Sequence, residues 1–213
     1  MAEAGDPSQE FGRIDIYLFD QILRGRIDPD MRVLDAGCGA GRNLVYLMRA
    51  GADVYGVDRD ARAIEQIREL AAKILPEGSA ERFHQGELTD LPFADAHIDV
   101  VICSAVLHFA NHEQHFDDMV AEMWRVLRPG GIFFARLAST IGIETLVRAT
   151  GPSGPRGGAR YELPDGSERF CVDLDFLLAL TDLLGGELLD PIKTTNVQNQ
   201  RCMTTWVVRK VSS

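Results

Sequence analysis

The feature that most constrains the fold of this chain is a short apolar run that passes directly into a glycine-rich turn. Residues 33–41 read VLDAGCGAG, and residues 42–50 continue with a helix-forming composition. A buried strand, a glycine bend and a helix in this order are typical of a parallel α/β sheet that binds a ligand at the carboxyl edge of its strands. Glycine is needed in such a bend because it adopts positive φ angles and lets the backbone approach a ligand closely.

Strand patterns and helix patterns alternate along most of the chain. We predict strands at residues 32–36, 53–57, 80–85, 98–104, 132–137, 187–197 and 200–211. We predict helices at residues 11–23, 42–50, 61–75, 113–127 and 173–184. This alternation predicts right-handed βαβ units, and the continuously apolar strands predict one α/β sheet with helices on both faces. Residues 1–10 are polar and are interpreted as a flexible tail, which leaves residues 11–213 as a single domain.

Charged residues around the glycine turn discriminate between ligands. Asp35 stands immediately before the first glycine, where its carboxylate would repel a pyrophosphate but suit an ammonium or sulfonium group. Arg42 occupies the third glycine position of the dinucleotide-binding pattern G-x-G-x-x-G, which also disfavours NAD. Asp58 ends the second strand, where a carboxylate can accept hydrogen bonds from both ribose hydroxyls, and capping the next helix is its alternative role. The pattern therefore favours a nucleoside that carries an amino acid.

The acidic composition excludes some classes of partner. The 213 residues carry a formal net charge of −10, so the surface suits neither nucleic acid nor an anionic membrane, apart from a local basic patch such as Arg156, Arg160 and Arg169. The four cysteines are scattered, and Cys38 and Cys103 fall in apolar strand patterns, which indicates buried thiols in a reducing compartment. We find no signal-peptide pattern and no apolar run of about 20 residues, so we expect a cytoplasmic protein.

Five segments stand in the order found in a known enzyme family, namely VLDAGCGAGRN, VYGVDRD, GELTDLPF, IDVVICSAVLHF and EMWRVLRPGG. With them the chain resembles the class I S-adenosylmethionine-dependent methyltransferases over about residues 11–138, and is similar to their small-molecule members of quinone biosynthesis and tellurite resistance. The resemblance implies a Rossmann-like, seven-stranded, mostly parallel sheet with an antiparallel last strand. It also implies methyl transfer from S-adenosylmethionine to a small-molecule acceptor, with S-adenosylhomocysteine as the product.

The resemblance assigns residues to the methionine end of the cofactor. Gly37 would contact this end, and Asp35 would steer its ammonium group. Ser104, at the end of the fourth strand, would contact it through the backbone, and Arg13 would pair with its carboxylate. The two remaining loop glycines would shape the bend, and they are Gly39 and Gly41.

A second group would hold the adenosine end. Asp58 would bind the ribose, and Arg59 would lie against the adenine. Glu87 would accept a hydrogen bond from the adenine amino group, and the Leu88 amide would donate one to a ring nitrogen. Glu87 stands where the family more often has aspartate, and a solvated loop carboxylate is the alternative interpretation for it.

The acceptor side offers fewer signals. His108, just after the fourth strand, is the candidate catalytic residue, as general base for an acceptor that arrives protonated, and packing is its alternative role. His112 and His115 lie at the start of the next helix, but no third ligand accompanies them, so no metal site is expected. Arg136 ends the fifth strand, and we expect it to pair with an acid such as Glu144, with an acceptor anion as the alternative partner.

An insert at residues 142–172 interrupts the alternation after the fifth strand. It contains a Gly/Pro-rich stretch at residues 151–158, interpreted as a flexible loop, and a turn at residues 164–167 between two strand-like pieces. Because it follows a strand that ends beside the methyl-donor pocket, we expect a lid that selects the acceptor.

Two other classes of function stay open. One is a protein that binds S-adenosylmethionine or S-adenosylhomocysteine without catalysis, since no residue is unambiguously catalytic. The other is an NAD-dependent oxidoreductase, which Asp35 and Arg42 disfavour. The identity of the acceptor and the oligomeric state do not follow from the sequence.

Overall fold

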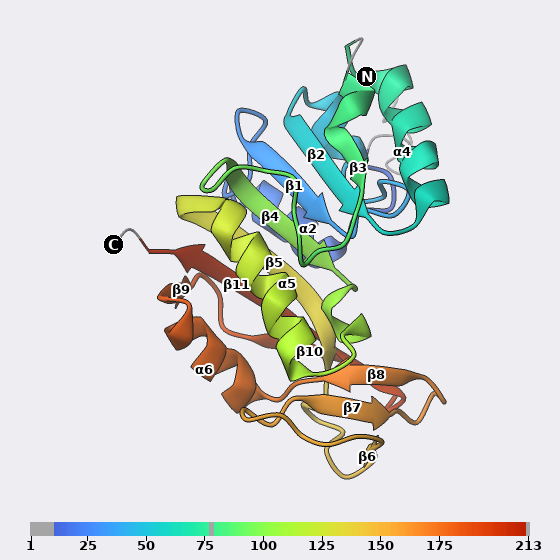
Figure 1. The fold of residues 1–213 in the computed structure, drawn as a ribbon, viewed down its shortest axis with the longest axis vertical. Helices are drawn as coiled ribbons and strands as arrows, with labels where there is room; N and C mark the ends of the chain where they lie inside the picture. Colours follow the sequence, from blue (N-terminus) through green and yellow to red (C-terminus); the bar gives the residue numbers. More distant parts are fainter. Residues whose placement is uncertain (1–10, 77–78, 212–213) are drawn as a thin grey trace, which may run out of the picture.

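A central sheet organises the computed structural model, which describes residues 11–76 and 79–211 (Figure 1). Its strands are β1 Arg32–Ala36, β2 Asp53–Asp58, β3 Phe83–Gln85, β4 Ile98–Ser104, β5 Leu127–Ser139, β9 Gly186–Leu188, β10 Lys193–Val197 and β11 Arg201–Lys210. They follow the order β10-β11-β5-β4-β1-β2-β3, and β9 pairs with the far end of β11. Strands β1 to β5 are parallel, whereas β11 runs antiparallel to β5. The predicted Rossmann-like sheet with an antiparallel last strand is confirmed.

Helices cover both faces of this sheet. They are α2 Ile16–Leu23, α3 Val45–Arg49, α4 Ala61–Ile74, α5 Glu113–Val126 and α6 Leu174–Leu183, with the 3-10 turns η1 Ser79–Arg82 and η2 Leu107–Phe109. Four of these helices have an N-cap residue whose side chain accepts a hydrogen bond from a backbone amide of the first turn. The four N-cap residues are Asp15, Asp60, His112 and Asp173. Asp60, rather than Asp58, caps the helix that follows β2, so the alternative role considered for Asp58 is wrong.

Two helices are shorter than the sequence pattern predicts. Helix α2 begins at Ile16 instead of residue 11, because Asp15 caps it and Gly12 has a φ of 66°. Helix α3 begins at Val45 instead of residue 42, because the bend at Gly41, with a φ of 84°, continues as a turn through residue 44. Both differences come from backbone conformations that an apolar repeat does not reveal.

Strand boundaries also differ from the prediction. Residues 79–82 form η1, so β3 starts only at Phe83, whereas β5 extends from Leu127 to Ser139 on both sides of its predicted range. The single strand predicted at residues 187–197 is divided into β9 and β10. The break falls at Pro191, which has no amide hydrogen to donate to a strand ladder.

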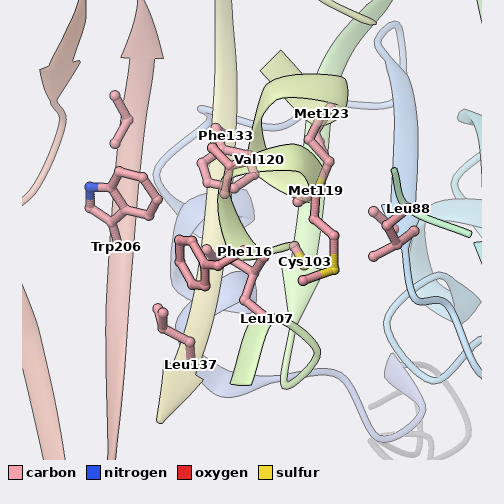
Figure 2. Close-up of a cluster of buried hydrophobic side chains, with 14 of the residues drawn as sticks. Leu88, Cys103, Leu107, Phe116, Met119, Val120, Met123, Phe133, Leu137 and Trp206 are labelled. Carbon is pink, nitrogen blue, oxygen red and sulfur yellow. The ribbon is translucent and has the colours of Figure 1, made fainter. Parts of the chain in front are cut away.

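Successive residues of the strands supply two cores on opposite faces of the sheet. On the face of α5 and α6, the side chains of Phe116 and Met123 pack with Phe133 of β5 and Trp206 of β11 (Figure 2). On the face of α2, α3 and α4, the next residue of β5, Phe134, joins the second core. Both phenylalanines are fully buried, as expected for a sheet covered on both sides.

A small antiparallel sheet lies at the carboxyl end of β5 (Figure 1). Its strands are β6 Arg148–Ala149, β7 Ala159–Glu162 and β8 Glu168–Cys171. The predicted turn at residues 164–167 joins β7 to β8, with Gly166 at a φ of 77°. The Thr140 amide donates to the Val172 carbonyl at 3.0 Å, which fixes the small sheet to the end of the main one.

All four cysteines are free and buried, as predicted for Cys38 and Cys103. Burial raises the pKa of the Cys171 thiol to about 12 and raises that of Cys103 further. In the part of the chain that the structure describes, no helix has the length and apolar character needed to cross a membrane. The predicted tail, residues 1–10, lies outside the described residues.

Candidate functional site

A pocket of about 290 Å³ opens at the carboxyl edge of the sheet. Five of the predicted cofactor residues line it together, and they are Gly37, Asp58, Arg59, Glu87 and Leu88. They come from three different strand ends, those of β1, β2 and β3, which parallel pairing brings side by side. Six further lining residues were not predicted as cofactor contacts, and they are Asp60, Gly86, Val106, Phe109, His115 and Met119. Asp60 and Gly86 adjoin predicted residues, whereas no local pattern indicated the other four, which face the pocket from the segment around η2 and from α5.

The glycine loop has the conformation that its sequence predicts. Gly37 and Gly39 have φ angles of 84° and 51°, in the left-handed region that side chains disfavour. A Cβ atom on Gly37 would also collide with the side chain of Val106. A Cβ on Gly41 would lie 2.9 Å from Cγ1 of Ile67, so this glycine lets the loop pack closely on α4. Gly37 alone of the three lines the pocket, while Gly39 and Gly41 shape the bend.

Asp58 connects the glycine loop to the end of β2. Its Oδ2 accepts the Gly39 amide at 2.8 Å, and its Oδ1 accepts the Asp60 amide at 2.9 Å. Each carboxylate oxygen has a second lone pair, so a half-buried Asp58 in the pocket wall still has capacity for hydroxyl donors.

Asp35 is buried next to the glycine loop instead of lining the pocket. It is 1% exposed, and neither carboxylate oxygen makes a hydrogen bond of good geometry among residues 11–76 and 79–211, although the Asn43 side chain lies near it. Burial raises the pKa of the Asp35 carboxyl to about 7, although the nearby Arg42 guanidinium acts in the opposite direction. An unpartnered buried carboxylate is unfavourable, so this position suits a ligand that brings a cation to the loop.

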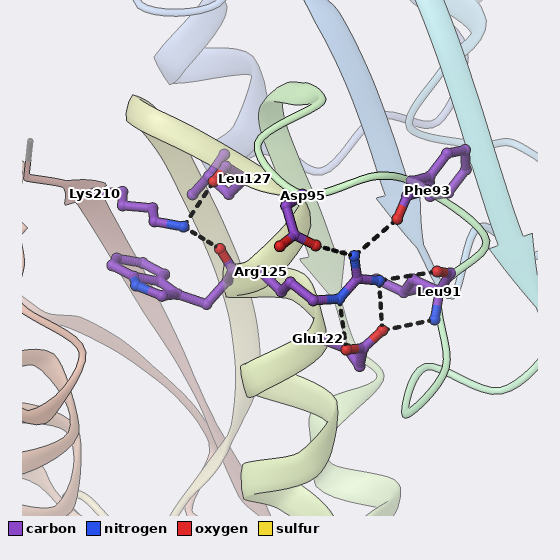
Figure 3. A network of polar contacts seen from close by, with 8 residues as sticks. Leu91, Phe93, Asp95, Glu122, Arg125, Leu127 and Lys210 are labelled. Atoms are coloured by element: carbon purple, nitrogen blue, oxygen red, sulfur yellow. Dashed lines mark hydrogen bonds and ion pairs between the residues drawn. The ribbon is translucent and has the colours of Figure 1, made fainter.

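Arg125 of α5 fixes the loop that forms one wall of the pocket (Figure 3). Its guanidinium donates to the carbonyls of Leu91 at 3.0 Å and Phe93 at 2.8 Å. It also pairs with Glu122 at 2.8 Å, and Glu122 accepts the Leu91 amide at 3.0 Å. These bonds hold the segment after Glu87 against α5, and the motif EMWRVLRPGG contains both charged partners.

A buried polar cluster lies between the glycine loop, α2 and the ends of β4 and β5. Ser104 Oγ donates to Asp15 Oδ2 at 3.3 Å and accepts from Arg42 Nη2 at 3.1 Å. Arg136 Nη1 donates to the same Asp15 oxygen at 2.9 Å. Ser104 does not line the pocket described above, and its side chain instead connects Asp15 to Arg42.

The partner of Arg136 differs from the expected one. It pairs with an acid as predicted, but this acid is Asp15 and not Glu144. Glu144 instead accepts the Gly142 amide at 2.7 Å. The sequence could not indicate Asp15, which lies 121 positions away and reaches Arg136 only because α2 packs across the sheet edge. Arg13, in the same N-terminal segment, is exposed and lines neither of the pockets described in this section.

A second pocket of about 290 Å³ lies on the other side of η2. Ala105 and His108 line it, whereas their neighbours Val106 and Phe109 line the first pocket, so this segment separates the two. Ala105 has a φ of 65°, an uncommon conformation for a residue with a side chain, and it turns the chain at this boundary.

His108 is buried in the wall of the second pocket. It is 6% exposed, and its Nδ1 has no hydrogen-bond partner among the described residues. Burial, together with the nearby Arg169 and Arg201, lowers the pKa of His108 to about 4. The imidazole is therefore neutral at pH 7, with one ring nitrogen available as an acceptor.

The other two histidines near this site bond to the backbone. His112 accepts the His115 amide at 3.1 Å, and His115 accepts the Asn111 amide at 3.2 Å. Within residues 11–76 and 79–211, no group of three or more His, Cys, Asp or Glu is arranged to hold a metal ion.

Comparison with known proteins relates this geometry to a family. Residues 34–135 match a family model described as a methyltransferase domain. An uncharacterized methyltransferase of Synechocystis sp. is 38% identical over 108 residues, which cover 50% of this chain and 47% of that relative. The crystal structure of Burkholderia thailandensis 1,6-didemethyltoxoflavin-N1-methyltransferase, with bound 1,6-didemethyltoxoflavin and S-adenosylhomocysteine, has a TM-score of 0.67 at 21% identity and covers 97% of this chain and 85% of that one.

Residues 34–135 are therefore similar to a methyltransferase domain, and the chain shares the fold of the matching solved structures.

Similarity to a methyltransferase domain does not by itself identify a reaction. The crystal structure of the [4+2]-cyclase SpnF matches this chain with a TM-score of 0.67 at 18% identity and covers 93% of this chain and 81% of that one. The chain also spans less than half the length of the first curated relatives that it matches. The reaction must therefore be argued from the site.

Proposed function

We propose that this chain transfers a methyl group from S-adenosylmethionine to a small-molecule acceptor. One observation carries the proposal: the strand ends of β1, β2 and β3 bring Gly37, Asp58 and Leu88 into the wall of a single pocket. A positive-φ glycine, a carboxylate and a backbone amide in this arrangement match the loop, ribose and adenine contacts of an adenosyl ligand.

The residues present fit this cofactor at both of its ends. The unpartnered carboxylate of Asp35 lies next to the loop where the ammonium group of the methionine end would bind. Asp58 would accept the ribose hydroxyls, Glu87 would accept the adenine amino group, and Arg59 would lie against the ring. Arg42, held by Ser104, replaces Arg13 in our proposal as the partner of the methionine carboxylate, because it lies at the loop.

The bound cofactor would supply a methyl group already activated by its sulfonium centre. The protein then has to align the acceptor with that methyl group and exclude water. His108 is the candidate group to accept a hydrogen bond or a proton from the acceptor, since its neutral imidazole lines the second pocket.

The small sheet at residues 142–172 is proposed as a lid over the acceptor. The proposal is supported by Leu163, Ser167 and Arg169, which line the second pocket from the β7–β8 turn and from β8. Phe170 packs on Phe116 in the main core, with ring centroids 5.4 Å apart, so a large deletion would damage the fold. Shortening only the exposed turn at residues 164–167 should lower turnover and leave the affinity for S-adenosylhomocysteine unchanged.

The proposed cofactor is tested by calorimetry with S-adenosylmethionine, S-adenosylhomocysteine and NAD. We expect both adenosyl ligands to bind and NAD to remain unbound, because Asp35 and Arg42 disfavour a pyrophosphate. Binding of NAD in place of the adenosyl ligands would refute the assignment.

A second function is a protein that binds S-adenosylhomocysteine or S-adenosylmethionine without catalysis. The low pKa of His108 favours this alternative, because it makes the histidine a weak base. Turnover of a labelled methyl group against a panel of acceptors separates the two functions. Methylation of any acceptor that disappears in an Asp58→Ala variant supports the enzyme.

A further inference from the structure

The second pocket collects positive charge in a chain that is strongly acidic overall. Three arginines line it, and they are Arg136 from the end of β5, Arg169 from β8 and Arg201 from the start of β11. None of its lining residues is an aspartate or a glutamate, although the whole chain carries a formal net charge of −10. Segments far apart in the sequence thus bring three guanidinium groups to one cavity.

The charges of these arginines are only partly compensated. Arg136 pairs with Asp15, but its Nε is buried without a hydrogen-bond partner among the described residues. Arg201 and Asp165 are 3.7 Å apart, too far for a good hydrogen bond, and the Arg201 side chain is 56% exposed. Arg169 pairs with no carboxylate in the described part of the chain and stacks 5.1 Å from the centre of the Phe109 ring.

A buried histidine lies in the same wall of the cavity as these arginines. His108 is more than nine-tenths buried, faces the cavity, and has an unpartnered Nδ1. Arg169 and Arg201 both lower its pKa, in addition to burial. A fourth positive charge is therefore excluded from the cavity, while a ligand that brings negative charge would be stabilised.

Apart from Ser167 and His108, the residues that complete the lining of this small cavity are apolar. Ala105, Leu163 and Met203 contribute to it, and its volume of about 290 Å³ suits a compact molecule. An acceptor with a hydrocarbon body and one anionic group would match both parts of the lining. A guanidinium fork recognises a planar carboxylate through two parallel hydrogen bonds.

We propose that the second pocket binds the methyl acceptor and that this acceptor is a small organic acid, held through its anionic group by Arg169 and Arg201. The statement that the bound molecule is the methyl acceptor rests on the proposed function. The statement that this pocket binds an organic anion does not depend on it. Residues 105–109 separate the second pocket from the first one, in which we place the adenosyl ligand and which we call the adenosyl pocket. A molecule in the second pocket therefore lies next to the proposed methyl donor.

The test compares benzoate, phenyl phosphate and the neutral benzamide, together with 3-phenylpropionate and its amide, in calorimetric titrations of the protein saturated with S-adenosylhomocysteine. We expect the acids to bind at least about tenfold more tightly than the amides, the scale of a hydrogen bond to a charged group. Tighter binding of benzoate than of phenyl phosphate identifies a carboxylate, and the reverse order identifies a phosphate ester. An acid panel in which no member binds more tightly than its amide overturns the proposal.

Variants locate the binding. Arg201→Gln and Arg169→Gln should each weaken benzoate binding about tenfold and leave benzamide unchanged. Arg148→Gln is the matched control, because this arginine of β6 lies outside the pocket with a side chain that is 74% exposed. Benzoate should also shift the ring-proton resonance of His108. Equal losses in Arg148→Gln and Arg201→Gln would show non-specific attraction and refute the site.

The same titrations separate this proposal from the proposed function. Failure of S-adenosylhomocysteine to bind, with benzoate still bound in an Arg201-dependent way, would reject the methyltransferase and keep the anion site. Normal binding of S-adenosylhomocysteine with no preference for acids would reject the anion site alone.

Discussion

The two aspartates at the carboxyl edge of the sheet differ in how their charges are stabilised by hydrogen bonds. Asp58 already accepts two backbone amides and lies in the pocket wall, so its charge is stabilised before any ligand arrives. Asp35, on the neighbouring strand β1, is fully buried and accepts no backbone amide within the described residues. One carboxylate is therefore arranged to hold a ligand, while the other is left unfavourable until a cation approaches.

Replacement of Asp58 tests its proposed contact with the ribose. Asp58→Ala should weaken S-adenosylhomocysteine binding by about 1–3 kcal/mol, the scale of lost hydrogen bonds to a charged group. Calorimetry measures the dissociation constant, and Asp182→Ala, at an exposed aspartate of α6, serves as the control. An unchanged dissociation constant in Asp58→Ala would contradict the ribose role.

Replacement of Asp35 tests the effect of its buried carboxyl on stability. Because the folded-state pKa is about 7 and the ordinary value is near 4, the folded protein binds more protons than the unfolded chain between these pH values. The wild type should therefore lose stability as the pH rises through this window, by up to about 1.4 kcal/mol per pH unit. Asp35→Asn removes this titration.

Urea unfolding of the ligand-free protein at pH 5 and pH 8 measures the difference. The Asp35→Asn variant should have a higher free energy of unfolding than the wild type at pH 8. This difference in the free energy of unfolding should become smaller toward pH 4. Asp182→Asn controls for loss of a surface charge. If the free energies of unfolding of the variant and the wild type differ by the same amount at both pH values, Asp35 does not titrate in this range.

Among the elements, α5 organises most of the site. Its first turn holds the loop that precedes β7, since Glu113 accepts the amides of Arg156 at 3.0 Å and Gly158 at 3.1 Å. Its middle places Met119 in the adenosyl pocket, and its last turn fixes the loop after β3 through Arg125 (Figure 3). One helix thus connects the proposed cofactor site with the proposed lid.

Loss of the Glu113 carboxylate should release the loop at residues 151–158. Glu113→Ala leaves the amides of Arg156 and Gly158 without their acceptor, so we expect faster hydrogen exchange there and a loss of about 1–3 kcal/mol in the free energy of unfolding. Hydrogen-exchange mass spectrometry and urea unfolding measure both effects. Gln114→Ala, on the exposed side of the same turn, should change neither, and equal exchange in the two variants would show that Glu113 does not anchor this loop.

For the molecule as a whole, the sheet edge brings together loops that have no sequence relation to one another. A ligand that contacts several of these loops binds only the folded state, and it therefore stabilises the protein by mass action. The adenosyl pocket depends on three strand ends and α5, so cofactor binding should report on the integrity of the complete fold.

Thermal unfolding tests this coupling. S-adenosylhomocysteine at one hundred times its dissociation constant should stabilise the protein by about 2.7 kcal/mol. For a chain of this size, that corresponds to a rise in Tm of about 5–10 °C. Asp58→Ala at the same ligand concentration should show a smaller rise, and an identical Tm with and without ligand in the wild type would contradict binding to the folded state.

Local sequence patterns were sufficient to predict the main strands and helices, and five of the ten predicted cofactor residues line the first pocket. The run VLDAGCGAG predicted the strand, the bend and the positive φ of Gly37, because these depend on neighbouring residues only. The same holds for the turn at residues 164–167 and for the strand that ends at Asp58. Periodicity did not reveal where α2 and α3 begin, because the cap at Asp15 and the turn after Gly41 set those points.

The sequence by itself determined the order of strands and helices and the ligand class that the glycine loop suits, since both follow from contacts between near neighbours. Only the tertiary structure decided that Asp15 pairs with Arg136, that Asp35 makes no hydrogen bond of good geometry within the described residues, and that Arg169 and Arg201 meet at His108. These are contacts between segments far apart in the chain, and their electrostatic consequences depend on burial, which exists only after the sheet and its loops have packed.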